Sequence, residues 1–240
     1  MREPRLLWGS RWRWSYEQAL LVAAALLFGV CLGSNRALTD HEALLAGSAK
    51  QMVLEGDWLL LRIGDQPWLE KPPLPQWLAA SCALAFGRFH EWTMRLPFAC
   101  AGVLVVLIIT RLMTTLFGRE VGLLAGFVQA TSVYQVAYAR LAESDVILQV
   151  FVLGAITVFQ ELETRRDELS AVQQSRLRLA FWILLGCTNL AKGLAFGAVL
   201  TLLTCGGWLL LRRDWAAWRR WWSPLGMALA LAIAAAWPLA

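Results

Sequence analysis

The chain has 240 residues, of which 58% are hydrophobic, and it carries 14 tryptophans and a formal net charge of +5. This composition is too apolar for an ordinary soluble domain, in which about 45–50% of residues are apolar. The basic residues lie in short clusters beside apolar blocks, which the positive-inside rule explains better than a phosphate-binding groove would. We therefore expect a protein that sits among membrane lipids and has no nucleic-acid partner.

The apolar blocks are close to the roughly 20 residues that a helix needs to cross hydrocarbon, so the fold class is all-α, a polytopic transmembrane helix bundle of about seven spans. Because the last block reaches Ala240 without a polar exit, we expect residues 1–240 to be a single N-terminal module whose last span is incomplete. In chain order, the predicted spans are about 18–34, 95–117, 120–139, 146–161, 178–191, 194–211 and 225 onward.

A further apolar segment, Pro72–Phe86, is predicted not to span. It is short, begins with three prolines and carries Gln76. Counting it as a span would place the basic N-terminus and the basic loop 161–178 on opposite sides of the membrane, against the positive-inside rule. We therefore expect an external loop at 35–94 with interfacial helices, a cytoplasmic N-terminus, and external positions for Asp40, Lys71 and Lys192.

Three carboxylates near predicted membrane boundaries are the candidate acids and bases. Thr39 and Glu42 have the spacing of a capping box, so Glu42 is explained equally well as a helix cap and as a site residue. Asp40 has no such easy explanation, and Asp145 lies at the start of a predicted span. Charges beside hydrocarbon are costly and usually face a cavity or a partner. Asp40, Glu42 and Asp145 could also bind a divalent cation, the one possible cofactor.

Candidate phosphate-binding cations are Lys71, Arg140 and Lys192. Two prolines follow Lys71 and fix the backbone that presents it, and a lysine held in this way suits a phosphate. The competing interpretation is that Lys71 and Lys192 are interfacial anchors whose ammonium groups reach into water. Arg95, at the head of a predicted span, is expected to orient a carboxylate or a phosphate.

The order of five short motifs resembles that of the family-39 glycosyltransferases of the GT-C class, in the group of the bacterial lipid A aminoarabinose transferase and the protein O-mannosyltransferases. The motifs are TDHEA at 39–43, GDWLLLRIGDQPWLEKPPLPQWL at 56–78, FGRFHEWTMRLP at 86–97, YARLAESD at 138–145 and AKG at 191–193. Each motif alone is weak, and their combined order is specific.

This resemblance implies an inverting transfer of a sugar from a polyprenyl-phosphate donor to a lipid, glycan or protein acceptor, on the external side of a bacterial inner membrane. Asp40 matches the expected catalytic base, although Glu42 could share or replace its role. Asp145 is expected to lie opposite Asp40. Lys71 is expected to contact the donor phosphate, and Lys192 is expected at the entrance of the same site. Members of the family also have further helices and often a C-terminal domain, and we expect this remainder of the family fold to be absent from residues 1–240.

Two other functional classes are compatible with the sequence. A transporter or flippase-like bundle would place charges inside its spans and would contain paired broken helices, whereas the notable charges here are predicted at one face. A non-catalytic membrane subunit, or an inactive fragment, would need none of the proposed roles.

Overall fold

In the computed structural model of the chain, residues 15–33, 37–193, 196–213 and 215–237 are described. Nearly all of the regular structure in this part is helical, and the remainder is one antiparallel pair of two-residue strands, so the predicted all-α fold is confirmed. The elements are α1 (Ser15–Gly29), α2 (Asp40–Glu55), β1 (Arg62–Ile63), β2 (Gln66–Pro67), α3 (Leu74–Phe86), α4 (Glu91–Phe117), α5 (Arg119–Thr131), α6 (Val133–Ala139), α7 (Ser144–Arg165), a 3-10 turn (Arg166–Glu168), α8 (Ala171–Lys192), α9 (Gly197–Arg212), α10 (Trp215–Trp221) and α11 (Pro224–Ala236).

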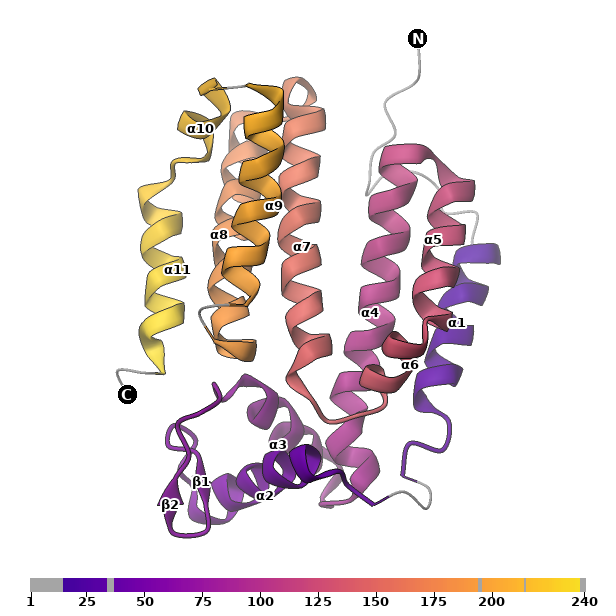
Figure 1. Cartoon of the computed structure of the whole chain (residues 1–240), viewed down its shortest axis with the longest axis vertical. Coiled ribbons are helices and arrows are strands. Elements are labelled where there is room, and N and C mark those ends of the chain that lie inside the picture. Colours follow the sequence, from indigo (N-terminus) through magenta and orange to yellow (C-terminus); the bar gives the residue numbers. More distant parts are fainter. Residues whose placement is uncertain (1–14, 34–36, 194–195, 214, 238–240) are drawn as a thin grey trace.

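The helices form two groups that share one direction (Figure 1). Helices α1, α4 and α5 pack together, and α7 packs with α8 and α9, with α11 against α8. Contact between α4 and α7 joins the two groups. Helices α2 and α3 and the β1–β2 hairpin gather at one end of the bundle, which we call the loop end (Figure 1).

The segment that was predicted not to span is α3, which has 13 residues and packs against α2 and α4 at the loop end. Prolines suit the first turn of a helix, where their missing N–H has no intrahelical partner, and Pro75 lies there. The helix ends at Gly87, whose positive φ of 64° favours glycine. The local sequence therefore sets both ends of a helix too short to cross the bundle.

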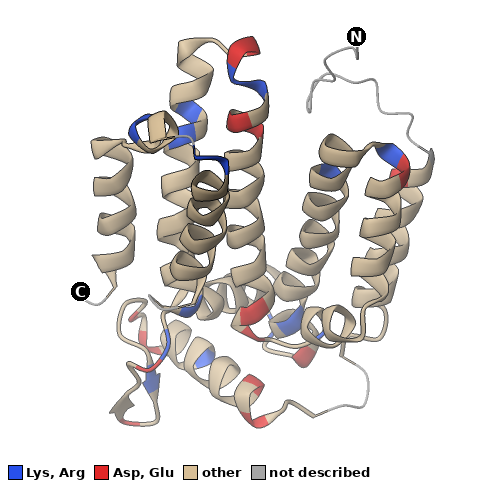
Figure 2. Cartoon of the chain, turned by 45° about the horizontal axis from the view of Figure 1, so that its top comes forward, with Lys and Arg blue, Asp and Glu red and all other residues tan. Residues whose placement is uncertain are grey.

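The basic turns lie at the opposite end of the bundle, which we call the arginine end (Figure 2). Arg119 begins α5 there, Arg166 follows α7, and Arg213 follows α9. Of the described helices, two runs are long and apolar enough to cross a membrane, Glu91–Phe117 and Ser144–Glu168. The arginines of the N-terminal 14 residues lie outside the described part, and which side of the membrane each end faces stays a prediction.

The expected span 120–139 is two helices rather than one. Ser132 separates α5 from α6 with a non-helical ψ of 130°. Its neighbours Thr131 and Val133 are β-branched, and serine competes for backbone hydrogen bonds, so all three residues favour a helix poorly. The Gln129 side-chain amide donates to Gln135 Oε1 across the break at 2.8 Å.

The apolar core is thickest at the loop end. One cluster joins Leu45 and Met52 of α2, Ala80 of α3, Phe98 of α4 and Val146 of α7. This cluster buries one face of α2 and one face of α3 against the bundle. It therefore fixes the positions of the loops on either side of these two helices.

Candidate active site

Glu42 is the most constrained of the predicted site residues. Its side chain is fully buried, and it forms an ion pair with buried Arg95, whose Nε lies 2.7 Å from Glu42 Oε1. The same carboxylate accepts hydrogen bonds from the backbone N–H of Thr39 at 3.0 Å and of Ala142 at 3.0 Å. The predicted capping box is present, and Glu42 also ties α2 to α4 and to the turn before α7.

These contacts keep Glu42 ionised. Burial by itself raises the pKa of this carboxyl group, but hydrogen bonds from Arg95, Thr39 and Ala142 outweigh it and hold the pKa below its ordinary value of 4.5. A group of this kind is a poor proton acceptor near neutral pH. The geometry therefore favours the structural interpretation of Glu42, and Arg95 orients a carboxylate as the sequence suggested.

Arg140 also has structural partners. Its Nη1 donates to the backbone carbonyl oxygens of Leu27 at 2.8 Å and Val30 at 2.9 Å, which lie at the C-terminal end of α1. The last carbonyl groups of a helix generally lack donors within the helix, and a cation there also complements the helix dipole. Arg140 does not line the pocket described next.

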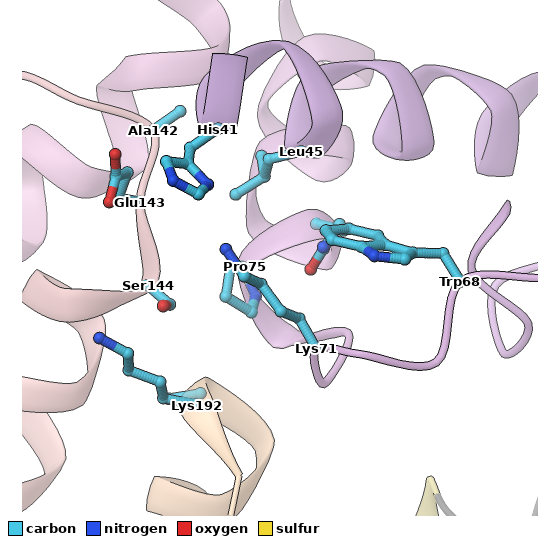
Figure 3. Close-up of a pocket in the computed structure, with 11 residues that line it drawn as sticks. His41, Leu45, Trp68, Lys71, Pro75, Ala142, Glu143, Ser144 and Lys192 are labelled. Atoms are coloured by element: carbon cyan, nitrogen blue, oxygen red, sulfur yellow. The ribbon is translucent and has the colours of Figure 1, made fainter. Parts of the chain in front are cut away.

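A shallow pocket lies at the loop end between α2, α3 and the start of α7, and its empty space of about 360 Å³ includes open solvent (Figure 3). It brings together segments that are far apart in the sequence. Its lining residues are His41, Leu45, Trp68, Lys71, Pro75, Gln76, Ala142, Glu143, Ser144, Ala191 and Lys192.

Two of the three predicted cations, Lys71 and Lys192, line this pocket, and they differ in whether another residue neutralises their charge. Lys192 Nζ lies 2.5 Å from Asp145 Oδ1, on the first turn of α7, so its charge is compensated. Lys71 forms neither an ion pair nor a hydrogen bond with any residue in the described ranges, and its Nζ lies 6.0 Å from the centre of the Trp68 ring. Its side chain extends toward His41 and Glu143 (Figure 3).

Asp40 is exposed at the first position of α2, one residue before His41, and does not itself line the pocket. Its carboxylate has no hydrogen bond or ion pair within the described part of the chain. The N-terminus of α2 favours a negative charge at this position. The structure thus leaves the Asp40 carboxylate without a described partner, one residue before His41 of the pocket.

The possible cation site at Asp40, Glu42 and Asp145 does not fit the geometry. Among the described residues, no group of three or more His, Cys, Asp or Glu side chains is close enough to hold a metal ion. The oxygens of Glu42 accept hydrogen bonds from N–H donors, and Asp145 faces Lys192.

Sequence reasoning gave no role to four polar pocket residues, His41, Gln76, Glu143 and Ser144. His41 lies beside the predicted site residues Asp40 and Glu42, and Glu143 lies in the same polar turn as Asp145. The polar character of these two segments therefore indicated the site, although not these residues. Gln76 carried a different signal, as a lone amide in an otherwise apolar helix. Its place in the pocket follows from packing between α2 and α3, which the sequence does not show.

Comparison with known proteins identifies the family. Residues 70–238 match the family described as dolichyl-phosphate-mannose–protein mannosyltransferase. An uncharacterized protein of Aquifex aeolicus (strain VF5) is 28% identical over 197 residues, which are 80% of this chain and 37% of that protein. Crystal structures of ArnT from Cupriavidus metallidurans, in the apo state and bound to undecaprenyl phosphate, superpose with TM-scores of 0.82 and 0.83. Each is 26% identical and covers 92% of this chain, and this chain covers 41% and 40% of them.

This chain therefore spans about 40% of the length of each of these relatives. The family match covers well over half of the chain, and the likeness to ArnT extends over nearly all of it. Apolar helices and these relatives together make it an integral membrane protein. The chain belongs to the dolichyl-phosphate-mannose–protein mannosyltransferase family, within the GT-C class of membrane glycosyltransferases.

Proposed function

We propose that this chain carries the donor-phosphate site of an inverting glycosyltransferase, which moves a sugar from a polyprenyl-phosphate donor to a lipid, glycan or protein acceptor. The reaction takes place at the loop end, on the external face of a bacterial inner membrane. The proposal rests on the family match and on the ArnT structure that holds undecaprenyl phosphate.

The observation that carries the proposal is the lysine without a partner in the pocket. Lys71 brings a positive charge to a partly enclosed space and forms no ion pair with any described carboxylate, including that of Glu143, which lines the same pocket. Such a charge attracts an anion, and a lysine ammonium is a common phosphate ligand. An anchor at the membrane interface would not need to point into a pocket.

The chemistry is one displacement at the anomeric carbon. An acceptor hydroxyl gives its proton to a base, and its oxygen forms a bond to the anomeric carbon. The bond from that carbon to the phosphate oxygen breaks, and polyprenyl phosphate leaves with the electron pair. Negative charge grows on the phosphate as this bond breaks, and Lys71 stabilises it where it develops.

The remaining predicted residues take distinct roles. Asp40, the exposed carboxylate at the start of α2, is the base that takes the acceptor proton. Asp145 holds Lys192 at the rim of the pocket through their ion pair. Glu42 and Arg140 keep their neighbouring backbone segments in position rather than touching substrate.

The test of the phosphate site compares two lysines on the same protein. Lys71→Met removes the pocket cation, whereas Lys50→Met removes an exposed lysine of α2 outside the pocket. We expect Lys71→Met to weaken binding of undecaprenyl phosphate by the purified chain in lipid nanodiscs by about ten- to a hundred-fold, as for loss of a charge-assisted hydrogen bond. Lys50→Met should leave the affinity unchanged. Equal affinities for both variants and the wild type would refute this phosphate site.

A further inference from the structure

The pocket contains a buried amide that the chain does not satisfy. Gln76 lies in the first turns of α3, its side chain is 1% exposed, and it lines the pocket. Its Oε1 has no hydrogen-bond donor within the part of the chain that the structure describes. Buried side-chain oxygens are normally paired, because leaving one unpaired costs the full desolvation of the group.

The surroundings of Gln76 within the chain do not explain a buried amide at this position. Its neighbours in α3 are apolar, and Ala79, Ala80 and Ala83 on the same helix are fully buried in the core at the loop end. A leucine would fill a similar volume there without an unpaired oxygen. Other glutamines, such as Gln149 and Gln160, also have an unpaired Oε1, but they do not line the pocket.

The missing partner must be a hydrogen-bond donor, since Oε1 is an acceptor. A phosphodiester cannot supply one, because at neutral pH its oxygens only accept. The hydroxyl or amino groups of a sugar can. The same pocket holds Lys71, the cation for the phosphate, so a sugar attached to that phosphate lies within the space that Gln76 faces.

We propose that Gln76 is a specificity-determining residue that accepts a hydrogen bond from a hydroxyl or amino group of the donor sugar. This inference rests on the proposed function. It adds a residue through which the site binds a glycosylated donor more tightly than the bare lipid phosphate. Sites built to hydrogen-bond a hydroxyl discriminate strongly against a ligand that lacks it, because their buried polar group is then left unpaired. A water molecule can also donate a hydrogen bond to Oε1. A sugar hydroxyl that displaces this water strengthens binding only if its own hydrogen bond to Oε1 is more favourable.

The test measures the affinity of the full chain in nanodiscs for undecaprenyl phosphate and for a panel of undecaprenyl-phosphate hexoses and pentoses. We expect the wild type to bind at least one glycosylated lipid about ten-fold tighter than the bare lipid, the size of one hydrogen bond to a buried group. Gln76→Leu should abolish that preference and leave the affinity for undecaprenyl phosphate unchanged. Its thermal unfolding midpoint should be equal to or above that of the wild type, because an unpaired buried oxygen is removed.

The matched control is Gln160→Leu, which removes another unpaired Oε1 from α7, about 22 Å along the helix from Asp145 at 1.5 Å per residue. It should keep the preference for the glycosylated lipid. A wild type without any preference would overturn the role of Gln76 while leaving the phosphate site intact. Gln76→Leu with an unchanged preference, or with a lower midpoint and parallel losses for both lipids, would also overturn it. A wild type that binds neither lipid would instead refute the proposed function.

Discussion

At the scale of single residues, the buried pair of Glu42 and Arg95 fixes the geometry of the site. Arg95 also donates to the carbonyl oxygens of Leu32 at 3.0 Å and Ala37 at 3.3 Å, after the end of α1. Together with the bond from Ala142 N–H to Glu42, the pair connects the segment after α1, α2, α4 and the turn before α7. The capping role of Glu42 could be predicted, because it depends on two residues three positions apart. Its bond to Ala142 could not, because that contact depends on how α2 packs against the turn before α7.

Removing one partner of this pair should destabilise the protein more than removing both. Glu42→Gln leaves the Arg95 charge buried without its counter-charge, and we expect a loss of about 3–5 kcal/mol in the free energy of unfolding. The double variant Glu42→Leu with Arg95→Met should recover part of that loss. Reversible unfolding in mixed detergent, monitored by tryptophan fluorescence, measures both. A double variant less stable than Glu42→Gln would contradict this assignment.

The same carboxylate predicts a dependence of stability on pH. Its pKa in the folded protein lies below the ordinary 4.5, so the unfolded chain binds the proton more tightly. The stabilising contribution is therefore complete above about pH 4.5 and is lost as the pH falls through the lower folded pKa. Unfolding curves between pH 3 and pH 7 should show this loss in the wild type and a smaller one in Glu42→Gln. Parallel curves for the two proteins would rule it out.

At the scale of elements, close packing by glycine sets how α4 meets α6 and α1. A Cβ placed on Gly102 of α4 would lie 2.6 Å from Ala139 Cβ and 3.1 Å from a ring carbon of Phe28. Small residues allow helix backbones to approach closely in a membrane, where packing rather than the hydrophobic effect holds helices together. Residues 120–139 were predicted as one span. The structure instead divides them into α5 and α6 at Ser132, where the residues favour a helix poorly. At α3, the prolines and Gly87 act locally and agree with the observed helix ends, whereas its non-spanning position stays a prediction.

A glycine-to-alanine pair tests this packing. Gly102→Ala should lower the free energy of unfolding by about 1–3 kcal/mol, because the added methyl group overlaps Ala139. Gly207→Ala is the control, since a Cβ on Gly207 of α9 meets no atom within 4 Å. It should be neutral or stabilising by up to about 1 kcal/mol, as expected from helix propensity. Similar effects at both positions would show that the contact with Ala139 is not close.

At the scale of the whole molecule, the basic turns and the candidate site lie at opposite ends of the bundle, and which side of the membrane each end faces stays a prediction. The basic turns gather at the arginine end, and Lys71, Lys192 and the carboxylates Asp40 and Asp145 lie toward the loop end (Figure 2). The sequence could indicate this separation because span length and arginine placement are local properties. It could not show that Arg140 would bind the carbonyl oxygens of α1, or that Gln76 would face the pocket, since both depend on the distance between helices.

Cysteine labelling in a cysteine-free background tests which ends share a side of the membrane. Asp65→Cys, in the turn between β1 and β2, and Asp167→Cys, in the turn after α7, both replace exposed acidic residues. In intact spheroplasts, a membrane-impermeant maleimide should label position 65 and leave position 167 unlabelled until the membrane is broken. Labelling of both positions in intact spheroplasts would contradict the topology, and so would protection of position 65.

The most direct measurement of glycosyl transfer follows a radiolabelled sugar from an undecaprenyl-phosphate donor into membrane lipid, glycan or protein, with the wild-type chain and Asp40→Asn. The wild type should transfer the label. Asp40→Asn should bind undecaprenyl phosphate as the wild type does, and its transfer rate should fall by about 10²–10⁴-fold, the usual contribution of a general base. Full transfer by Asp40→Asn would contradict its role as the base, and a wild type that binds the donor but transfers no sugar would contradict the account of this pocket as a catalytic site.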